Sequence, residues 1–152
     1  MNPICADNAD EIIRRACVKA DELGVAACIA VVDSGAHLKA FRRMDGAFIG
    51  AVDVAQRKAR TSALFPLGSG EFGQVIADQQ LTGMELSNGG LAAFHGGLPI
   101  MNGDTAVGAI GVSGEFGGAG SRDRPVRAGY GRDAVIPVNK LWLLVSLAVR
   151  PV

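Results

Sequence analysis

This sequence of 152 residues contains two histidines, and their side chains are the first candidates for a binding site. The imidazoles of His37 and His95 could each ligate a metal ion. Neither belongs to a group of histidine, aspartate and glutamate with the spacing of a catalytic metal site. For His37, in an expected turn, a surface histidine bonded to its neighbours is the favoured alternative. For His95, which precedes Gly96-Gly97, two interpretations are equally favoured: a metal ligand and a loop residue without a special role.

The second group of candidates is charged: Arg42, Arg43, Asp45 and Lys58. Arginine and lysine side chains bind carboxylates well, so a small organic acid is one ligand that they could hold. The favoured alternative is a salt bridge from Asp45 to one of these bases, within the chain or between subunits. No residues form a recognised catalytic constellation, so none is assigned a catalytic role and we do not expect an enzyme.

The composition describes one globular domain without a strong electrostatic preference. Basic and acidic residues are balanced at 15 each, which gives no reason to expect nucleic acid or an anionic membrane as partner. The first residues are too polar for a signal peptide, and the longest apolar run, 141–149, is too short to span a bilayer. We therefore expect a cytoplasmic protein. Cys5, Cys17 and Cys28 form no Cys-x-x-Cys pair, and Cys17 and Cys28 suit small buried positions in a reduced protein.

Hydrophobic periodicity predicts helices and strands in the order of an α+β domain. An apolar stripe at helical spacing predicts a helix that Gly24 ends, and a second helix begins near Gly50 and stops at Pro66. The buried face of this second helix is expected to hold Val52, Ala55, Ala59 and Ala63, with Arg57, Lys58 and Arg60 off it. A short helical turn is expected over 72–81. The expected strands are 26–32, 38–43, 91–94, 98–101 and 105–112.

These elements predict an antiparallel sheet of about five strands with helices packed to one side, in two layers. The first two strands form a hairpin, and 102–104 joins the last two in a tight turn. Residues 1–114 form the predicted domain, and 115–152 form an atypical tail rich in glycine and arginine. Three interpretations of the tail stay open: a natural divergent tail, a non-native or frame-shifted sequence, and a partner-binding extension.

Several segments in order along the chain carry a resemblance to a known family. In order and spacing they resemble the GlcG/HbpS family of small haem-associated proteins, which includes the C-terminal domain of PduO, over roughly residues 8–114. The resemblance implies a profilin- or PAS-like sheet with flanking helices and a homo-oligomer, a tetramer or octamer. It also implies a closing helix where Pro125 would break one. The segments are 32–38, 43–47, 58–61, 87–90, 96–100 and 108–114.

The resemblance implies haem as the cofactor, held without catalysis by a carrier, sensor or accessory protein. His95 is then the candidate iron ligand, because Gly96-Gly97 would leave room for a flat macrocycle, and His37 is the other imidazole. Arg42, Arg43 and Lys58 would hold the haem propionates. One alternative is an accessory protein of glycolate, glycerol or corrinoid-dependent diol metabolism that binds a small organic acid. Another is a purely structural oligomerisation module.

Overall fold

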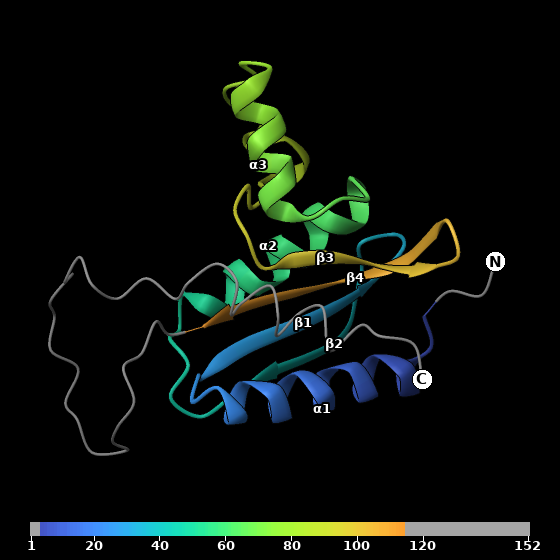
Figure 1. Ribbon diagram of the computed structural model, residues 1–152, viewed down its shortest axis with the longest axis vertical. Coiled ribbons are helices and arrows are strands. Elements are labelled where there is room, and N and C mark those ends of the chain that lie inside the picture. Colours follow the sequence, from blue (N-terminus) through green and yellow to red (C-terminus); the bar gives the residue numbers. More distant parts are fainter. Residues whose placement is uncertain (1–3, 115–152) are drawn as a thin grey trace, which may run out of the picture.

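The computed structural model describes residues 4–114, in which helices lie on both faces of one four-stranded antiparallel sheet (Figure 1). The strands are β1 (Ala27–Asp33), β2 (Leu38–Arg43), β3 (Gly97–Asn102) and β4 (Thr105–Gly114), in the spatial order β2-β1-β4-β3. The helices are α1 (Ala6–Glu22), α2 (Ala51–Leu64), α3 (Ser69–Asp78) and the 3-10 helix η1 (Met84–Gly89). The predicted α+β class and antiparallel sheet are confirmed, and the likeness to profilin or PAS domains stays a prediction.

The central strand β1 is apolar at nearly every position because it is covered on both faces. Its neighbours are β2 and β4, paired antiparallel, with Ile29 opposite Arg42 on one side and opposite Val112 on the other. Successive side chains of a strand point to opposite faces of the sheet. Ile29 and Val31 therefore join the core under α1, whereas Cys28, Ala30 and Val32 join the core under α2.

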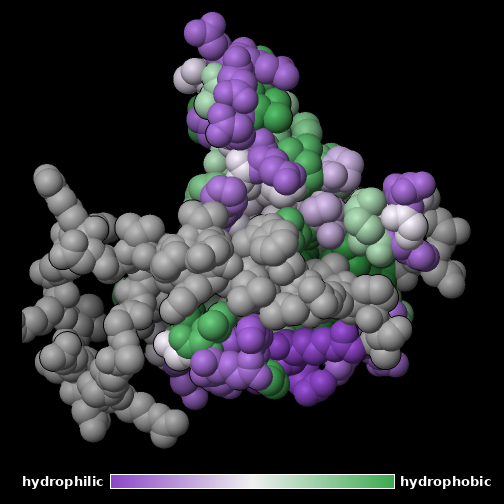
Figure 2. All heavy atoms as spheres, viewed as in Figure 1, coloured by the Kyte–Doolittle hydropathy of each residue, from purple (hydrophilic) through white to green (hydrophobic). Residues whose placement is uncertain are grey.

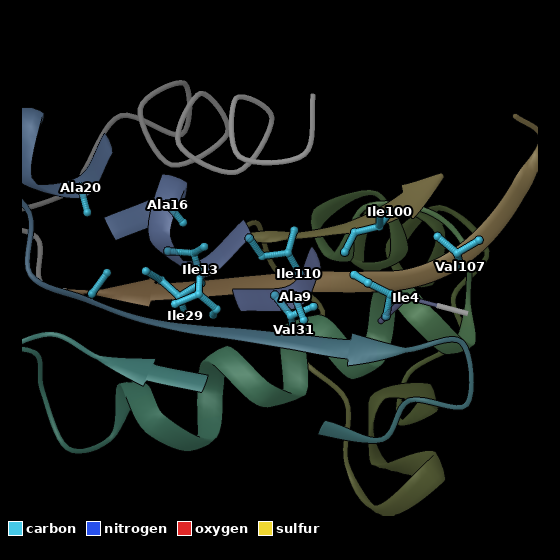
Figure 3. Close-up of a cluster of buried hydrophobic side chains, with 12 residues drawn as sticks. Ile4, Ala9, Ile13, Ala16, Ala20, Ile29, Val31, Ile100, Val107 and Ile110 are labelled. Atoms are coloured by element: carbon cyan, nitrogen blue, oxygen red, sulfur yellow. The ribbon is translucent and has the colours of Figure 1, made fainter. Parts of the chain in front are cut away.

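The helices lie on both faces, so the expectation that they pack to one side in two layers is wrong. The α1 core is built from Ala9, Ile13, Ala16 and Ala20 of α1 against aliphatic residues of three strands (Figure 3). The outward side of α1 gathers hydrophilic side chains (Figure 2). Helix α2 covers the opposite face with alanines. An uninterrupted apolar strand has two faces to bury. Helices on both sides of the sheet, in three layers, bury both faces of β1, whereas two layers would leave one face exposed.

Helix α2 lies unusually close to the sheet, as its alanine-rich face predicted. Ala55 and Ala59 are fully buried against β4. A methyl group at Gly111 would overlap the carbonyl oxygen of Ala55 and the amide of Ala59. At Gly97, in β3, a methyl group would overlap the carbonyl oxygen of Lys58. Small residues on both surfaces therefore set the distance between α2 and the strands.

The segment between α2 and β3 differs most from the sequence prediction. Residues 91–94 form an irregular loop rather than the expected fifth strand, and α3 is a full helix that projects away from the sheet (Figure 1). The tight turn between β3 and β4 is confirmed, with Gly103 at a φ of 59°. The predicted tail, 115–152, lies outside the described residues. Within residues 4–114, no helix is long and apolar enough to cross a membrane.

Candidate functional site

Lys58 is buried, in contrast to the prediction that it lies off the packed face of α2. The residue is 3% exposed, and its Nζ donates a hydrogen bond of 3.1 Å to the carbonyl oxygen of Val112. The ammonium also lies 4.7 Å from the centre of the Phe94 ring. Burial lowers the pKa of Lys58 from its ordinary 10.5 to about 8. No carboxylate of the described chain pairs with this amine.

The loop that carries Phe94 is held in place by hydroxyl groups of α2 and α3. Ser69 donates from Oγ to the carbonyl oxygen of Phe94 (2.6 Å) and accepts from the amide of Gly97 (2.9 Å). Thr61 accepts from the amide of Ala92 (3.0 Å). Ser62, one helical turn after Lys58, has a buried Oγ without a partner among the described residues. The loop backbone is thus fixed, whereas Phe94 is 53% exposed.

His95 is exposed beside this loop, and its neighbouring glycines serve packing. The imidazole lies so close to Gly70 of α3 that a methyl group there would overlap it. The space that Gly97 leaves is taken by the Lys58 backbone, so it is not open to a macrocycle. Gly96 is buried, and its carbonyl oxygen accepts a hydrogen bond of 2.7 Å from the amide of Val112. Iron ligation by His95 stays a prediction.

The charged candidates on and after β2 do not form one cluster. Because Arg42 and Arg43 are adjacent in a strand, their side chains point to opposite faces of the sheet. Arg43 donates to the carbonyl oxygen of Ala47 from Nη2 (3.1 Å) and Nε (3.3 Å). Arg42 lies on the α1 face, where its charge opposes the burial that raises the pKa of Cys17. Asp45 is exposed and makes no ion pair within residues 4–114.

His37 occupies a turn organised by Asp33. The carboxylate of Asp33 accepts hydrogen bonds from the amides of Gly35 (2.9 Å) and His37 (3.0 Å), which lower the pKa of Asp33. The Nδ1 of His37 lies 3.4 Å from the same carboxylate, and the side chain is 83% exposed. This is the locally bonded surface histidine that the alternative interpretation described. Within residues 4–114, no hydrogen bond or ion pair uses the Nε2 of His37.

A surface cleft of about 400 Å³ brings His37 beside one face of α2. Arg57 and Arg60 line it with Asp53 and Gln56, and Gly89-Gly90 closes the other side. Arg57 donates from Nη1 to the carbonyl oxygen of Gly89 (3.0 Å) and pairs through Nε with Asp53. A methyl group at Gly90 would overlap the guanidinium of Arg57, so this glycine makes the room that Arg57 occupies.

Sequence reasoning missed Arg57 and Arg60 as site residues and chose Lys58 from the same helix. The spacing of Asp53, Arg57 and Arg60 places them together on an exposed helical face, which was the available signal. Their approach to His37 and Gly89-Gly90 depends on contacts between distant parts of the chain. Within residues 4–114, no group of three or more His, Cys, Asp or Glu side chains could hold a metal ion.

Comparison with known protein families assigns the chain to one of them. The model of the family of haem-degrading, HbpS-like proteins matches residues 4–126, and the chain belongs to this family. The match continues beyond the predicted domain boundary at residue 114.

Two relatives support the same assignment at the level of sequence. A 15.0 kDa protein from the dhaT-dhaS intergenic region of Citrobacter freundii is 35% identical over 98 residues, covering 63% of this chain and 69% of that protein. GlcG of Escherichia coli K12 is 33% identical over 85 residues, which cover 56% of this chain and 62% of GlcG. The match thus spans less than two thirds of GlcG.

Solved structures show the same fold. Klebsiella pneumoniae ORFY superposes with a TM-score of 0.77 at 28% identity, over 98% of this chain and 90% of that one. A variant of Streptomyces reticuli HbpS gives a TM-score of 0.70 at 28% identity, over 75% of this chain and 76% of HbpS. The complex of PduOC with haem gives 0.76 at 21% identity, over 97% and 94%, and this likeness concerns the fold.

Proposed function

We propose that this protein binds haem in the cleft between α2 and the β1–β2 turn. The iron ligand is Nε2 of His37, and Arg57 and Arg60 hold the propionates. The observation that carries the proposal is the meeting of one imidazole and two guanidinium groups in a single cleft. Membership in a family of haem-degrading proteins, and a haem complex with the same fold, support this choice of ligand.

The chemistry of the cleft fits haem. A metal-bound histidine usually offers its second ring nitrogen to a carboxylate, and Asp33 lies at that position relative to Nδ1 of His37. A volume of about 400 Å³ falls within the range of small-molecule sites. Val32, Ala36 and Leu38 contribute apolar surface beside the polar groups. When bound, haem supplies an iron centre whose ligation is visible in the Soret band.

The two arginines differ in how firmly they are held. Arg57 is fixed by Asp53 and Gly89, which leaves less side-chain entropy to be lost when a carboxylate binds. Arg60 is exposed and makes no ion pair within residues 4–114, so its positive charge is available to a carboxylate. Because they lie three residues apart on one helix, both can face the same ligand.

Haemin titration of five proteins tests the proposal. Wild type should show a saturable, near-stoichiometric Soret shift. His37→Ala should alter the Soret position more than His95→Ala, the matched change at the other imidazole. The paired change Arg57→Gln and Arg60→Gln should weaken binding but preserve the band position. A larger effect of His95→Ala would identify His95 as the iron ligand, as the sequence suggested. A wild-type spectrum in His37→Ala/His95→Ala would exclude imidazole ligation.

A second candidate function uses the same arginines without haem. Two guanidinium groups beside Gln56 could bind the carboxylate of a small organic acid, which was the alternative from sequence. Calorimetric titration with glycolate distinguishes the two. Glycolate binding that depends on Arg57 and Arg60, in a protein without a saturable haemin shift, would favour this candidate.

The family description raises haem breakdown as a further candidate activity. It departs from the non-enzymatic carrier expected from sequence. Loss of Soret absorbance with time, after addition of a reductant to the haemin-loaded protein in air, would indicate breakdown. A stable band under those conditions would favour a carrier or sensor.

A further inference from the structure

Lys58 is the one buried charged residue among residues 4–114. It is 3% exposed and donates one hydrogen bond, to a backbone carbonyl oxygen, although an ammonium has three donors. The Oγ of Ser62, on the following turn of the same buried helix face, also lacks a partner in this part of the chain. Buried polar groups normally have partners, so an unpartnered hydroxyl one helical turn from a buried amine with a single hydrogen bond indicates a place built for more than packing.

The amine of Lys58 lies next to an exposed aromatic residue, Phe94. Nζ lies 4.7 Å from the centre of the Phe94 ring, and Phe94 is 53% exposed. Ser69 fixes the peptide of Phe94, so rotation of the side chain would uncover the amine without moving the loop. Rotamer changes of exposed side chains take picoseconds to nanoseconds. A small molecule could therefore reach Nζ from the Phe94 side.

We propose that Lys58 is a nucleophilic amine that forms a Schiff base with a short-chain aldehyde admitted under the Phe94 ring. The nitrogen lone pair of the neutral amine attacks the carbonyl carbon and forms a C–N bond. The carbonyl oxygen takes up a proton while the nitrogen loses one, which gives a carbinolamine. The carbinolamine hydroxyl then takes up a proton and leaves as water when its C–O bond breaks, while the nitrogen loses its remaining proton and a C=N bond forms. Amine and aldehyde thus become imine and water without any oxidant or reductant.

The surroundings favour a neutral carbonyl compound over an anion. Desolvation favours the uncharged amine, which is the nucleophilic form and the reason why buried lysines serve in Schiff-base chemistry. The neighbours of Nζ are an aromatic ring and a carbonyl oxygen, and that oxygen would repel an anion. An uncharged aldehyde loses less hydration than an anion when it enters such a place.

The wild-type protein provides the decisive test, because two other described lysines serve as internal controls. Lys19 pairs with Glu22, and Lys39 is exposed. Acetaldehyde with cyanoborohydride would trap any imine as an N-ethyl group, and peptide mass mapping would locate it. We expect Lys58 to be labelled at least about tenfold faster than Lys39 at pH 7, because a lowered pKa leaves more of its amine neutral.

Two variants test the covering ring. Phe94→Ala should accelerate labelling of Lys58 and leave that of Lys39 unchanged, whereas Phe94→Leu, which keeps an apolar cover, should react at close to the wild-type rate. Labelling of Lys58 no faster than Lys39 in both wild type and Phe94→Ala would overturn the proposal. The inference is independent of haem binding, so His37→Ala should leave the labelling pattern unchanged.

Discussion

The amine of Lys58 lies 3.1 Å from the carbonyl oxygen of Val112, where the pairing of β3 with β4 ends. The last pair joins Gly97 to Gly111, and the amide of Val112 reaches one residue further, to the carbonyl oxygen of Gly96. The side chain of Lys58 thus supplies a donor to a strand carbonyl beyond the β3 ladder. A helix side chain completes the hydrogen bonding of a sheet edge, and the helix is held against the sheet.

Burial of Lys58 should make stability rise in mildly alkaline solution. Its pKa is about 8 in the folded protein and ordinarily 10.5. Below pH 8 the amine is charged in both states and the full burial cost is present. Between these values the folded protein has lost a proton that the unfolded chain retains, so the free energy of unfolding rises with pH, by about 3 kcal/mol in total.

Urea unfolding of wild type and Lys58→Met at pH 7 and pH 10 measures this rise. Cys17 and Cys28 have pKa values raised by burial, so their ionisation lowers stability over the same alkaline range in both proteins. Only the difference between the proteins reports Lys58, and wild type should gain relative to Lys58→Met as pH increases. A constant difference would show that Lys58 is charged in the folded state.

Gly111→Ala should destabilise the protein by about 1–3 kcal/mol, because the new methyl group meets the backbone of α2. Gly50→Ala is the matched control. Gly50 precedes the same helix at a φ of −61°, and a methyl group there would meet nothing within 4 Å. Thermal unfolding should separate the two variants clearly, and equal melting temperatures would mean that α2 does not pack on Gly111 as described.

Asp33→Ala should lower stability by about 1 kcal/mol, since the carboxylate accepts two backbone amides in the β1–β2 turn. The pKa of Asp33 is lowered, mainly by the amide of His37. Its stabilisation is therefore present above the ordinary value of 3.8 and lost as pH falls through the folded value. Asp45→Ala, at an exposed position without an ion pair in residues 4–114, should leave the melting temperature unchanged.

A salt bridge from Asp45 to Arg42 or Arg43, the alternative considered from sequence, would instead make the change at Asp45 destabilising. Thermal scans at pH 7 and pH 3 measure both aspartate variants. A loss for Asp45→Ala as large as that for Asp33→Ala would indicate a partner for Asp45 outside the described chain, such as a second subunit.

Light scattering should return a multiple of the 15.7 kDa chain mass, with a tetramer or octamer as the expected assembly. The cores are built largely of alanine, which buries little apolar area per residue. Large apolar side chains stay exposed, among them Ile49 at 76% and Leu86 at 78%. Contact with a second copy would remove them from water. A monomer mass at micromolar concentration would contradict this prediction.

The local sequence pattern was sufficient to predict the elements nearest the centre of the sheet. The apolar run 26–32 predicted β1, the turn residues predicted both hairpins, and alanine spacing predicted the close approach of α2. These features depend on residues near one another in sequence, whose periodicity records which side is buried. The same β1 run also implied two covered faces, which the two-layer prediction overlooked.

Tertiary structure decided what sequence spacing left open, namely which polar groups meet. Lys58 was expected off the packed face of α2, yet it is buried because β4 presents the Val112 carbonyl and the 90–96 loop presents Phe94. His37 lines the same cleft as Arg57 because β1 packs beneath α2. Both arrangements join segments far apart in the chain, and their partners are chosen by the packing of the whole sheet rather than by any local periodicity.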